Sequence, residues 1–387
     1  MAPITQLSSA PATVMDESGE PRFGTYLGPF ETVNLRGLRA PFGKGPIDRV
    51  RHLKKWVYGF AADDRISVLC AIVETGYIAT AFVAVTDLRS GDVIVDRSVL
   101  AAPGPLVRVS DQPAHGLNAA LLSPLGTFRT RRPARSDHYR VTVSSTPPVE
   151  SVVAAVRPAT DVTGRVLGAL PLVGDRLRGL VVNQSAGAKV SLDLRFAAGR
   201  TPVLSVVAPV EHGGGTINVT QKVAGLPVTG VVTVGGRTWQ IEDGVGGFDY
   251  AHGYLARHTS WNWAFACGHL PDGSRLGLNL VSGFNESRPD VNENALWLGD
   301  RLIPLDRAAF AFDRDDPASP WAVATADGSV ELSFTPCTIH SERKDLVVLT
   351  SRFLQPIGMF SGVLRVDGEE IPVDGLPGVT EDQDITW

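Results

Sequence analysis

The segment Ser260–Ser282, SWNWAFACGHLPDGSRLGLNLVS, decides the fold class. It reads as two strands, Ser260–Leu270 and Ser274–Ser282, joined by a Pro-Asp-Gly turn signal. Strand alternation gives the first strand a bulky face and a small, partly polar face. The bulky face holds Trp261, Trp263, Phe265 and Cys267, and the small face holds Ser260, Asn262, Ala264 and Ala266. Two interpretations stay open: the small face lines a hollow barrel, or the bulky face is core and Asn262 faces solvent.

The same pattern recurs along most of the chain. Short, branched runs separated by turn residues include 66–74, 78–86, 140–144, 178–183, 189–196, 203–208, 216–223, 228–234, 294–298, 301–305, 330–334 and 362–366. The single amphipathic helix that we expect is short and lies near Ile47–Tyr58. Many strands at this spacing with few helices predict an all-β sandwich or barrel protein. A length of 387 residues favours two domains.

Composition excludes several classes of protein. The net charge of −5 argues against a nucleic-acid binder, which normally carries a basic surplus. The N-terminus lacks the features of a secretory signal, and no apolar run approaches the roughly 18 residues needed to span a bilayer. Three cysteines without a CxxC spacing indicate neither a disulfide framework nor a zinc site. We therefore expect a soluble cytoplasmic protein.

Most of the chemically unusual residues lie between positions 244 and 297. Gly244–Tyr254 sets an aspartate between two aromatic residues, with glycines on both sides, and Arg257–Trp263 follows closely. The whole stretch holds three of the seven Trp and three of the eight His residues. Grouped glycines let the backbone approach a ligand closely, and Tyr and Trp join large apolar faces to polar tips. We predict that the active site of the protein lies here.

Particular motifs in this stretch resemble a known family. Gly247–Gly253 (GFDYAHG), Trp261-Asn262-Trp263 and the strand Arg275–Leu280 look like the bacterial family called domain of unknown function 2804. The resemblance runs from about residue 35 to residue 382. The order of glycine, aromatic residue, Asp and glycine, followed by Trp-x-Trp and a turn, is also distantly similar to the carotenoid 1,2-hydratase and AttH-like lipocalin superfamily. That likeness implies two lipocalin-like barrels and cofactor-free water addition to, or rearrangement of, apolar polyenes or terpenoids.

The superfamily likeness also implies roles for individual residues. Asp249 occupies the place of the motif acid, and Trp261 and Trp263 stand where that superfamily has its Trp-x-Trp-like pair. Two positions depart from the pattern: Tyr250 stands where the superfamily has His, and His252 where it has Trp. These exchanges bear on the reaction more than on the fold.

The chemistry of the residues agrees with this implication. A carboxylic acid among apolar aromatics stays protonated near neutral pH, because burial disfavours its charged form. Asp249 has such neighbours in the sequence and is our candidate proton donor, with His252 or His258 positioning water or taking up a proton. The substrate-binding candidates are Tyr250, Tyr254, Trp261, Asn262, Trp263, Asn279, Glu293 and Asn294. The alternative for Asp249 is a turn cap, and for the other polar residues a satisfied structural role.

We therefore predict an all-β protein of two lipocalin-like antiparallel β-barrels with few short helices. An extended arm (1–25) precedes an N-terminal domain (26–243) and a C-terminal domain (244–387), with the site at their junction. The predicted function is a hydratase, dehydratase, isomerase or cyclase that binds an apolar small molecule and uses acid catalysis, without cofactor or metal. The alternatives are a non-catalytic carrier of an apolar metabolite and a glycoside-active enzyme with Asp249 and Glu293 as its carboxylate pair. The sequence leaves a homodimer open.

Overall fold

A computed structural model describes residues 7–146, 188–345 and 349–387 of the chain. Within these residues the only helices are the 3-10 helix η1 (Leu35–Gly37) and the α-helix α1 (Pro46–His52). The all-β prediction is confirmed. The helix predicted near Ile47–Tyr58 ends earlier, at His52, because the alternating residues that follow enter a strand directly. The strand predicted over 178–183 lies outside the described residues.

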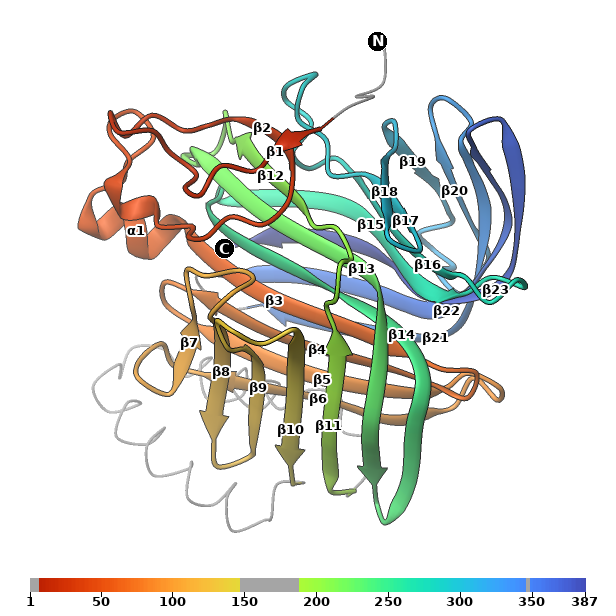
Figure 1. Ribbon diagram of the computed structural model, residues 1–387. Coiled ribbons are helices and arrows are strands. Elements are labelled where there is room, and N and C mark those ends of the chain that lie inside the picture. Colours follow the sequence, from red (N-terminus) through yellow and green to blue (C-terminus); the bar gives the residue numbers. More distant parts are fainter. Residues whose placement is uncertain (1–6, 147–187, 346–348) are drawn as a thin grey trace.

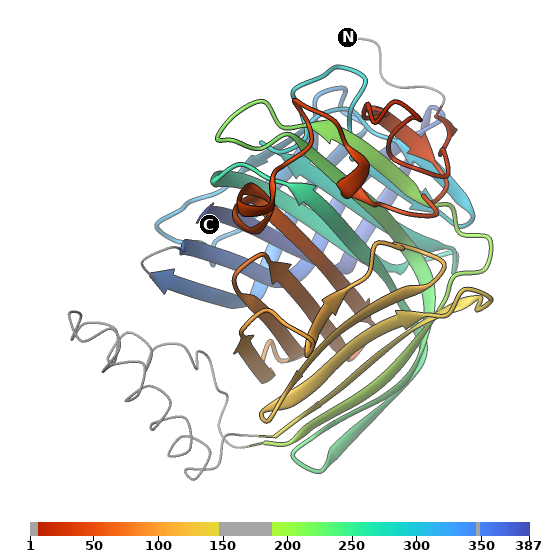
Figure 2. The same cartoon turned by 90° about the vertical axis from the view of Figure 1, so that its left-hand side faces the viewer.

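Fourteen of the described strands form the first sheet, which is coloured red to green in Figure 1. They are β1 (Ser8–Ser9), β2 (Gly24–Leu27), β3 (Leu53–Ala62), β4 (Ile66–Thr75), β5 (Ala79–Asp87), β6 (Val93–Ala101), β7 (Val107–Val109), β8 (Leu117–Ser123), β9 (Gly126–Arg132), β10 (His138–Ser145), β11 (Val190–Ala197), β12 (Leu204–Pro209), β13 (Ile217–Val234) and β14 (Arg237–Tyr254). Its main path runs from β6 through β3, β14 and β13 to β7. The sheet curls round so that β7 and β8 contact β4 and β5, which makes it a nearly closed barrel (Figure 2).

Nine further strands form the second sheet, coloured teal to blue in Figure 1. They are β15 (His258–His269), β16 (Arg275–Ser282), β17 (Ala295–Leu298), β18 (Arg301–Pro304), β19 (Ala308–Ala311), β20 (Trp321–Thr325), β21 (Val330–Asp345), β22 (Thr350–Val366) and β23 (Glu369–Thr386). The neighbours are antiparallel in the order β18 to β15, then β23 to β19. This sheet curves into a half-barrel, so the two-barrel prediction is confirmed at the level of the fold.

Strand alternation divides the apolar residues of the first sheet between two layers. One face turns into the barrel and forms its core, with Val57 of β3 and Phe248 and Tyr250 of β14. The other face packs against the second sheet, with Phe60 of β3 against Phe265 of β15 at a ring-centroid distance of 6.1 Å. A face that would be solvated in an isolated barrel is therefore buried here.

The junction of the two sheets lies near the predicted domain boundary. β14 continues through residues 243 and 244 without a break; it pairs with β13 over most of its length and with β3 from Val245 to Tyr254. The chain changes sheets after Tyr254, and β15 begins the second sheet at His258. In the predicted N-terminal arm, residues 7–25 pack onto the first sheet, where Val14 is fully buried.

Candidate active site

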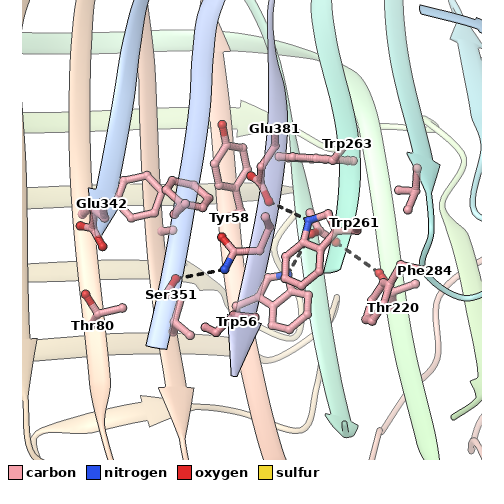
Figure 3. Close-up of a pocket in the computed structure, with 18 of the residues that line it drawn as sticks. Trp56, Tyr58, Thr80, Thr220, Trp261, Trp263, Phe284, Glu342, Ser351 and Glu381 are labelled. Atoms are coloured by element: carbon pink, nitrogen blue, oxygen red, sulfur yellow. Dashed lines mark hydrogen bonds between the residues drawn. The ribbon is translucent and has the colours of Figure 1, made fainter. Parts of the chain in front are cut away.

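A cavity of about 150 Å³ lies between the outer face of the first sheet and the facing side of the second (Figure 3). Aromatic rings make up much of its wall. They belong to Trp56, Tyr58, Phe82, Trp261, Trp263, Phe284, Phe353 and Trp387. The polar side chains of the wall come from both sheets and include carboxyl groups, lysines and hydroxyls. Pockets with apolar walls and a few convergent polar groups are typical of small-molecule sites.

Three polar residues of the first sheet form one row across neighbouring strands. The strand register pairs Lys222 of β13 with Asp249 of β14, and it pairs Asp249 with Tyr58 of β3. Cross-strand partners on one face have Cβ atoms about 5 Å apart, so the three side chains are neighbours. The pairing of distant strands thus assembles this part of the site.

Lys222 holds two carboxyl groups together in this row. Its Nζ lies 2.7 Å from Oδ1 of Asp249 and 3.1 Å from Oε2 of Glu293, and all three side chains are buried. Trp56 Nε1 donates to Oδ2 of Asp249 at 2.8 Å, and the Thr220 hydroxyl donates to Oδ1 at 3.2 Å. Asp249 therefore has a cation and two neutral donors around it. We call Lys222, Asp249 and Glu293 the lysine cluster.

Burial and charge compete in the lysine cluster. Burial alone would lower the pKa of Lys222, but the two carboxyl groups outweigh it and raise that pKa above its ordinary value. Burial raises the pKa of Glu293, helped by the charge of Asp249, more than the lysine lowers it. One ammonium group faces two carboxyl groups here, so Lys222 stays charged and Glu293 takes up a proton more readily than a solvated glutamate.

A third carboxyl group, that of Glu381 in β23, projects from the second sheet, and no cation of the described residues is bonded to it. Trp261 Nε1 donates to its Oε1 and Gln355 Nε2 to its Oε2, both at 2.7 Å. Burial raises the pKa of Glu381 to about 7, although these two hydrogen bonds oppose the shift. A carboxyl group with that pKa holds a proton near neutral pH and can donate it.

Four of the predicted site residues line the cavity. They are Asp249, Trp261, Trp263 and Glu293. The predicted residue Asn279 supports this group from behind, because it accepts a hydrogen bond from Trp263 Nε1 at 2.8 Å and donates to the backbone oxygen of Glu293 at 2.7 Å. Asn285 donates to Oε1 of Glu293 at 2.9 Å. These amides fix the orientation of the lining side chains.

Three predicted residues of β14 point the other way, into the first barrel. Tyr250 and Tyr254 belong to the barrel core, and the Tyr250 hydroxyl donates to the backbone oxygen of Ser110 at 3.0 Å. His252 is buried with its Nδ1 3.7 Å from Asp111, and burial lowers its pKa well below the ordinary value. Alternation along β14 gives the reason, since these residues occupy the face opposite to that of Asp249.

The remaining predicted residues also lie outside the cavity wall. His258 is more than half exposed and lies 3.1 Å from the Asp384 carboxylate. The Asn262 amide donates to Oδ1 of Asp382 at 3.0 Å. Oδ1 of Asn294 accepts a hydrogen bond from the backbone of Val281. His258 is thus part of a surface pair, and the two asparagines hold strands together.

The structure also distinguishes the two faces of β15. The bulky face meets the cavity through Trp261 and Trp263, whereas Ala264 and Ala266 of the small face belong to the core of the second sheet. The interpretation that the small face lines the cavity was therefore wrong. The other interpretation placed Asn262 in solvent. In the structure Asn262 is half-buried, and its side chain is hydrogen-bonded to Asp382. The second sheet has its own core on that side, which leaves no room for a ligand.

Sequence reasoning did not place Tyr58, Lys222 or Glu381 in the active site. In 217–223, alternation places Asn218, Thr220 and Lys222 on one face, which resembles the solvated face of an edge strand. In 379–385, Glu381 shares a face with Val379 and Ile385, and an acid on an apolar face was a usable signal. Tyr58 had no distinguishing signal, because it lies in an ordinary alternating strand.

A second group of polar side chains lines another part of the cavity. Glu342 of β21 accepts hydrogen bonds from Lys344 and from Ser98 of the first sheet, and it lines the cavity together with Lys344. Nearby, His340 Nδ1 lies 2.8 Å from Oδ2 of Asp96. These contacts join β21 to β6, so polar side chains connect the two sheets at this end.

Two general observations concern the described part of the chain. In residues 7–146, 188–345 and 349–387, no group of three or more His, Cys, Asp or Glu side chains is arranged to hold a metal ion. No helix among them has the length and apolar character needed to cross a membrane.

Comparison with known proteins identifies the family. No functionally curated protein matches the sequence significantly. The putative AttH from Nitrosomonas europaea is 15% identical, with 90% of this chain and 96% of that chain covered and a TM-score of 0.43. Kievitone hydratase from Nectria haematococca is 10% identical, with coverages of 93% and 97% and a TM-score of 0.45. CghA is 12% identical, with both chains covered to 98% and a TM-score of 0.50, which indicates a shared fold. The model of the family described as domain of unknown function (DUF2804) matches residues 5–387, so the resemblance seen in the sequence is confirmed and the chain belongs to that family.

Proposed function

We propose that this protein is an enzyme that uses acid–base chemistry, without a cofactor, to hydrate, dehydrate, isomerise or cyclise a mostly apolar small molecule. The reaction takes place in the cavity between the two sheets. One observation carries the proposal: Glu381 offers a carboxyl group, held by the neutral donors Trp261 and Gln355, to a cavity walled by aromatic rings. Such a group is a proton donor placed where an apolar substrate would lie.

Glu381 and Asp249 have different roles in this proposal. The sequence suggested Asp249 as the proton donor, but the Lys222 ammonium group lies 2.7 Å from its carboxyl group and forms an ion pair with it. Glu381 instead donates the proton to a carbon of the substrate, and Asp249 accepts a proton or stabilises developing positive charge. The aromatic rings stabilise a cationic transition state by about 0.5–2 kcal/mol each. His252 and His258 have no part in this scheme, because neither lines the cavity.

The geometry does not favour the glycoside-active alternative. That alternative needs Asp249 and Glu293 to flank a scissile bond, with the substrate between them. Lys222 Nζ occupies that position, because it bonds to both carboxyl groups. The carrier alternative uses the same cavity, so only turnover separates it from the enzyme.

The experiment tests proton transfer directly. A panel of terpenoids, polyenes and conjugated ketones is incubated with the protein in D₂O, and mass spectrometry detects added water or carbon-bound deuterium. On any substrate found, we expect Glu381→Gln to lose about 10²–10⁴-fold in turnover, as for removal of a general acid. Ligand binding, followed by Trp fluorescence, should persist, because glutamine keeps the shape.

The matched control is Asp384→Asn, which changes an exposed carboxylate on the opposite face of the same strand. It should leave turnover unchanged. A fully active Glu381→Gln together with an inactive Asp249→Asn would return the role of proton donor to Asp249. Saturable binding of apolar ligands with no deuterium incorporation into any of them would favour the carrier.

A further inference from the structure

The Tyr58 hydroxyl has no hydrogen-bond partner among the described residues. The residue is 5% exposed and its hydroxyl oxygen is buried. Two other buried tyrosines behave differently: Tyr250 donates to the Ser110 backbone oxygen, and Tyr139 accepts from Arg132. A buried hydroxyl without a partner costs about 1–3 kcal/mol of desolvation, which a hydrogen bond to a ligand would offset. The Tyr58 hydroxyl is therefore open to a hydrogen bond that none of the described residues supplies.

Tyr58 lies where a ligand would meet both sets of carboxyl groups. It is the cross-strand partner of Asp249, and its ring packs edge-on against Trp263 with centroids 5.0 Å apart. Trp263 is in turn the cross-strand partner of Glu381. Figure 3 shows Tyr58, Trp263 and Glu381 on the wall of the same pocket. The phenol and the Glu381 carboxyl group thus belong to one small region of the cavity.

Both of these groups are hydrogen-bond donors near neutral pH. Burial and the neighbouring charges of Glu381 and Asp249 raise the pKa of Tyr58 well above its ordinary value, so the phenol keeps its proton. Glu381, when protonated, offers a second O–H. The Tyr58 donor in an apolar cavity stabilises an oxygen atom that gains negative charge during a reaction, as at an oxyanion hole, while the Glu381 proton is free to be transferred to carbon. A carbonyl oxygen conjugated to a reacting double bond is such an atom.

We propose that the substrate is an apolar ketone, or another conjugated carbonyl compound, whose oxygen accepts a hydrogen bond from Tyr58. The inference rests on the proposed function and narrows its substrate class, because a pure hydrocarbon would leave Tyr58 without an acceptor. Tyr58 acts by holding the carbonyl group and polarising it, next to the acid in Glu381 and the base in Asp249.

Asp249 and Glu381 account for every proton that moves in a hydration reaction. Water adds its oxygen to the β-carbon of the conjugated double bond, and the proton that it loses goes to the Asp249 carboxylate. The α-carbon takes a proton from Glu381, so the C=C bond becomes a single bond and the carbonyl is restored. Asp249 then loses its proton and Glu381 regains one by exchange with solvent. Dehydration is the same sequence in reverse.

The test uses two probes of the same shape. One is 2-acetylnaphthalene, and the other is 2-isopropenylnaphthalene, in which a CH₂ group replaces the carbonyl oxygen. Calorimetry with the full chain should show that the ketone binds roughly 10-fold more tightly than the alkene. This factor corresponds to about 1.4 kcal/mol, the contribution of one buried hydrogen bond. Tyr58→Phe should abolish this preference while the alkene binds as before.

A spectroscopic measurement tests the contact itself. The ¹³C-labelled carbonyl of bound 2-acetylnaphthalene should absorb at lower wavenumber in the wild type, because its oxygen accepts a hydrogen bond. In Tyr58→Phe the band should move toward its position in an aprotic solvent. A wild-type band already at that position would overturn the inference, even if the variant did not fold.

Thr80→Val is the matched control, because Thr80 carries another hydroxyl that lines the cavity and has no partner among the described residues. It should keep the preference for the ketone. Loss of the preference in Thr80→Val but not in Tyr58→Phe would assign the carbonyl to Thr80 and overturn the role of Tyr58. Equal binding of both probes by the wild type would overturn this inference and leave the proposed function standing. If neither probe bound, the proposed function would be contradicted as well.

Discussion

The two groups of carboxylic acids in the cavity differ in one partner. In the lysine cluster, Asp249 and Glu293 share the ammonium of Lys222. On the opposite wall, Glu381 accepts hydrogen bonds from Trp261 and Gln355 and has no cation bonded to it among the described residues. Burial is similar at both places, since each of these acids is about 95% buried. The ammonium group of Lys222 is therefore the main difference between the two surroundings, and burial raises the pKa of Glu293 even beside it.

This comparison shows how one cavity can hold an acid and a base at the same pH. Burial disfavours charge on every carboxyl group, and nearby cations and hydrogen-bond donors oppose that effect to different degrees. Pairs of titratable groups whose surroundings separate their pKa values are a mark of acid–base sites. Variants of Lys222, Glu381 and Tyr58 separate the effects of the cation, of burial and of the phenol on stability.

The largest effect should follow removal of the lysine. Lys222→Met leaves two buried carboxyl groups without a cation, which should lower the free energy of unfolding by about 3–5 kcal/mol near pH 8. The loss should shrink at acidic pH, where protonation of the carboxyl groups removes the uncompensated charge. Urea unfolding followed by Trp fluorescence at both pH values measures it.

Lys55→Met is the control for this variant. Lys55 pairs with Asp111 at 2.7 Å, but that carboxylate is about one-third exposed. Its removal should cost about 1 kcal/mol or less, as for other partly solvated pairs. Equal losses from the two variants would mean that the lysine cluster is solvated, and the comparison of the two walls would fail.

The pH dependence of stability should reveal Glu381. Its pKa is raised from 4.5 to about 7 in the folded protein, so between these values the folded state binds more protons than the unfolded state. The contribution of Glu381 to the free energy of unfolding is fully present below about pH 4.5 and is lost as pH rises through about 7. The loss amounts to about 3 kcal/mol, the free-energy equivalent of that pKa shift.

Glu381→Gln should remove this dependence. The variant should be about as stable as the wild type near pH 4.5 and more stable above pH 7, when unfolding is measured across that range. Gln355 can accommodate the new amide, because its Oε1 has no partner among the described residues and can turn to accept a hydrogen bond. Parallel stability curves for the two proteins would show that Glu381 ionises like a solvated glutamate, and the difference between the walls would disappear.

The phenol between the two walls should have a smaller effect on stability. Tyr58→Phe removes a hydroxyl without a protein partner, so the free energy of unfolding should stay the same or rise by up to about 1 kcal/mol. Tyr250→Phe is the matched control, because its hydroxyl donates to the Ser110 backbone oxygen. That variant should lose about 1–2 kcal/mol, since it leaves a buried carbonyl unpaired. Thermal unfolding measures the stability of both variants. If Tyr58→Phe were less stable than Tyr250→Phe, the view that the Tyr58 hydroxyl lacks a protein partner would be contradicted.

The smallest effect is expected at His258. Its side chain is 60% exposed and pairs with Asp384, which is 51% exposed, so the pair lies on the surface rather than on either wall. His258→Gln should change stability by less than about 0.5 kcal/mol, as for most exposed positions. Turnover on an identified substrate should stay within about two-fold of wild type. A loss approaching that of Glu381→Gln would place a third acid–base group in the site.

The strand pattern of this chain could be predicted without the structure. Ser260–Leu270 and Ser274–Ser282 became β15 and β16 with ends shifted by at most two residues. Turn residues and two-residue alternation are local properties, so they indicate a strand wherever it is placed. The motif acid Asp249 and the pair Trp261 and Trp263 were also found this way, because their residue types are unusual in their setting.

The pairing of distant strands and the surface that covers each face were decided only by the tertiary structure. Alternation shows that Asp249 and Tyr250 point to opposite sides of β14, but it does not show which side meets the cavity. Lys222 occupies the kind of polar face that water normally covers, and here the second sheet covers it instead. Protonation depends on burial and on nearby charge, both of which arise from contacts between residues far apart in sequence. The sequence by itself therefore determined the strands and their alternating faces, whereas the packing of the two sheets selected Glu381, Lys222 and Tyr58.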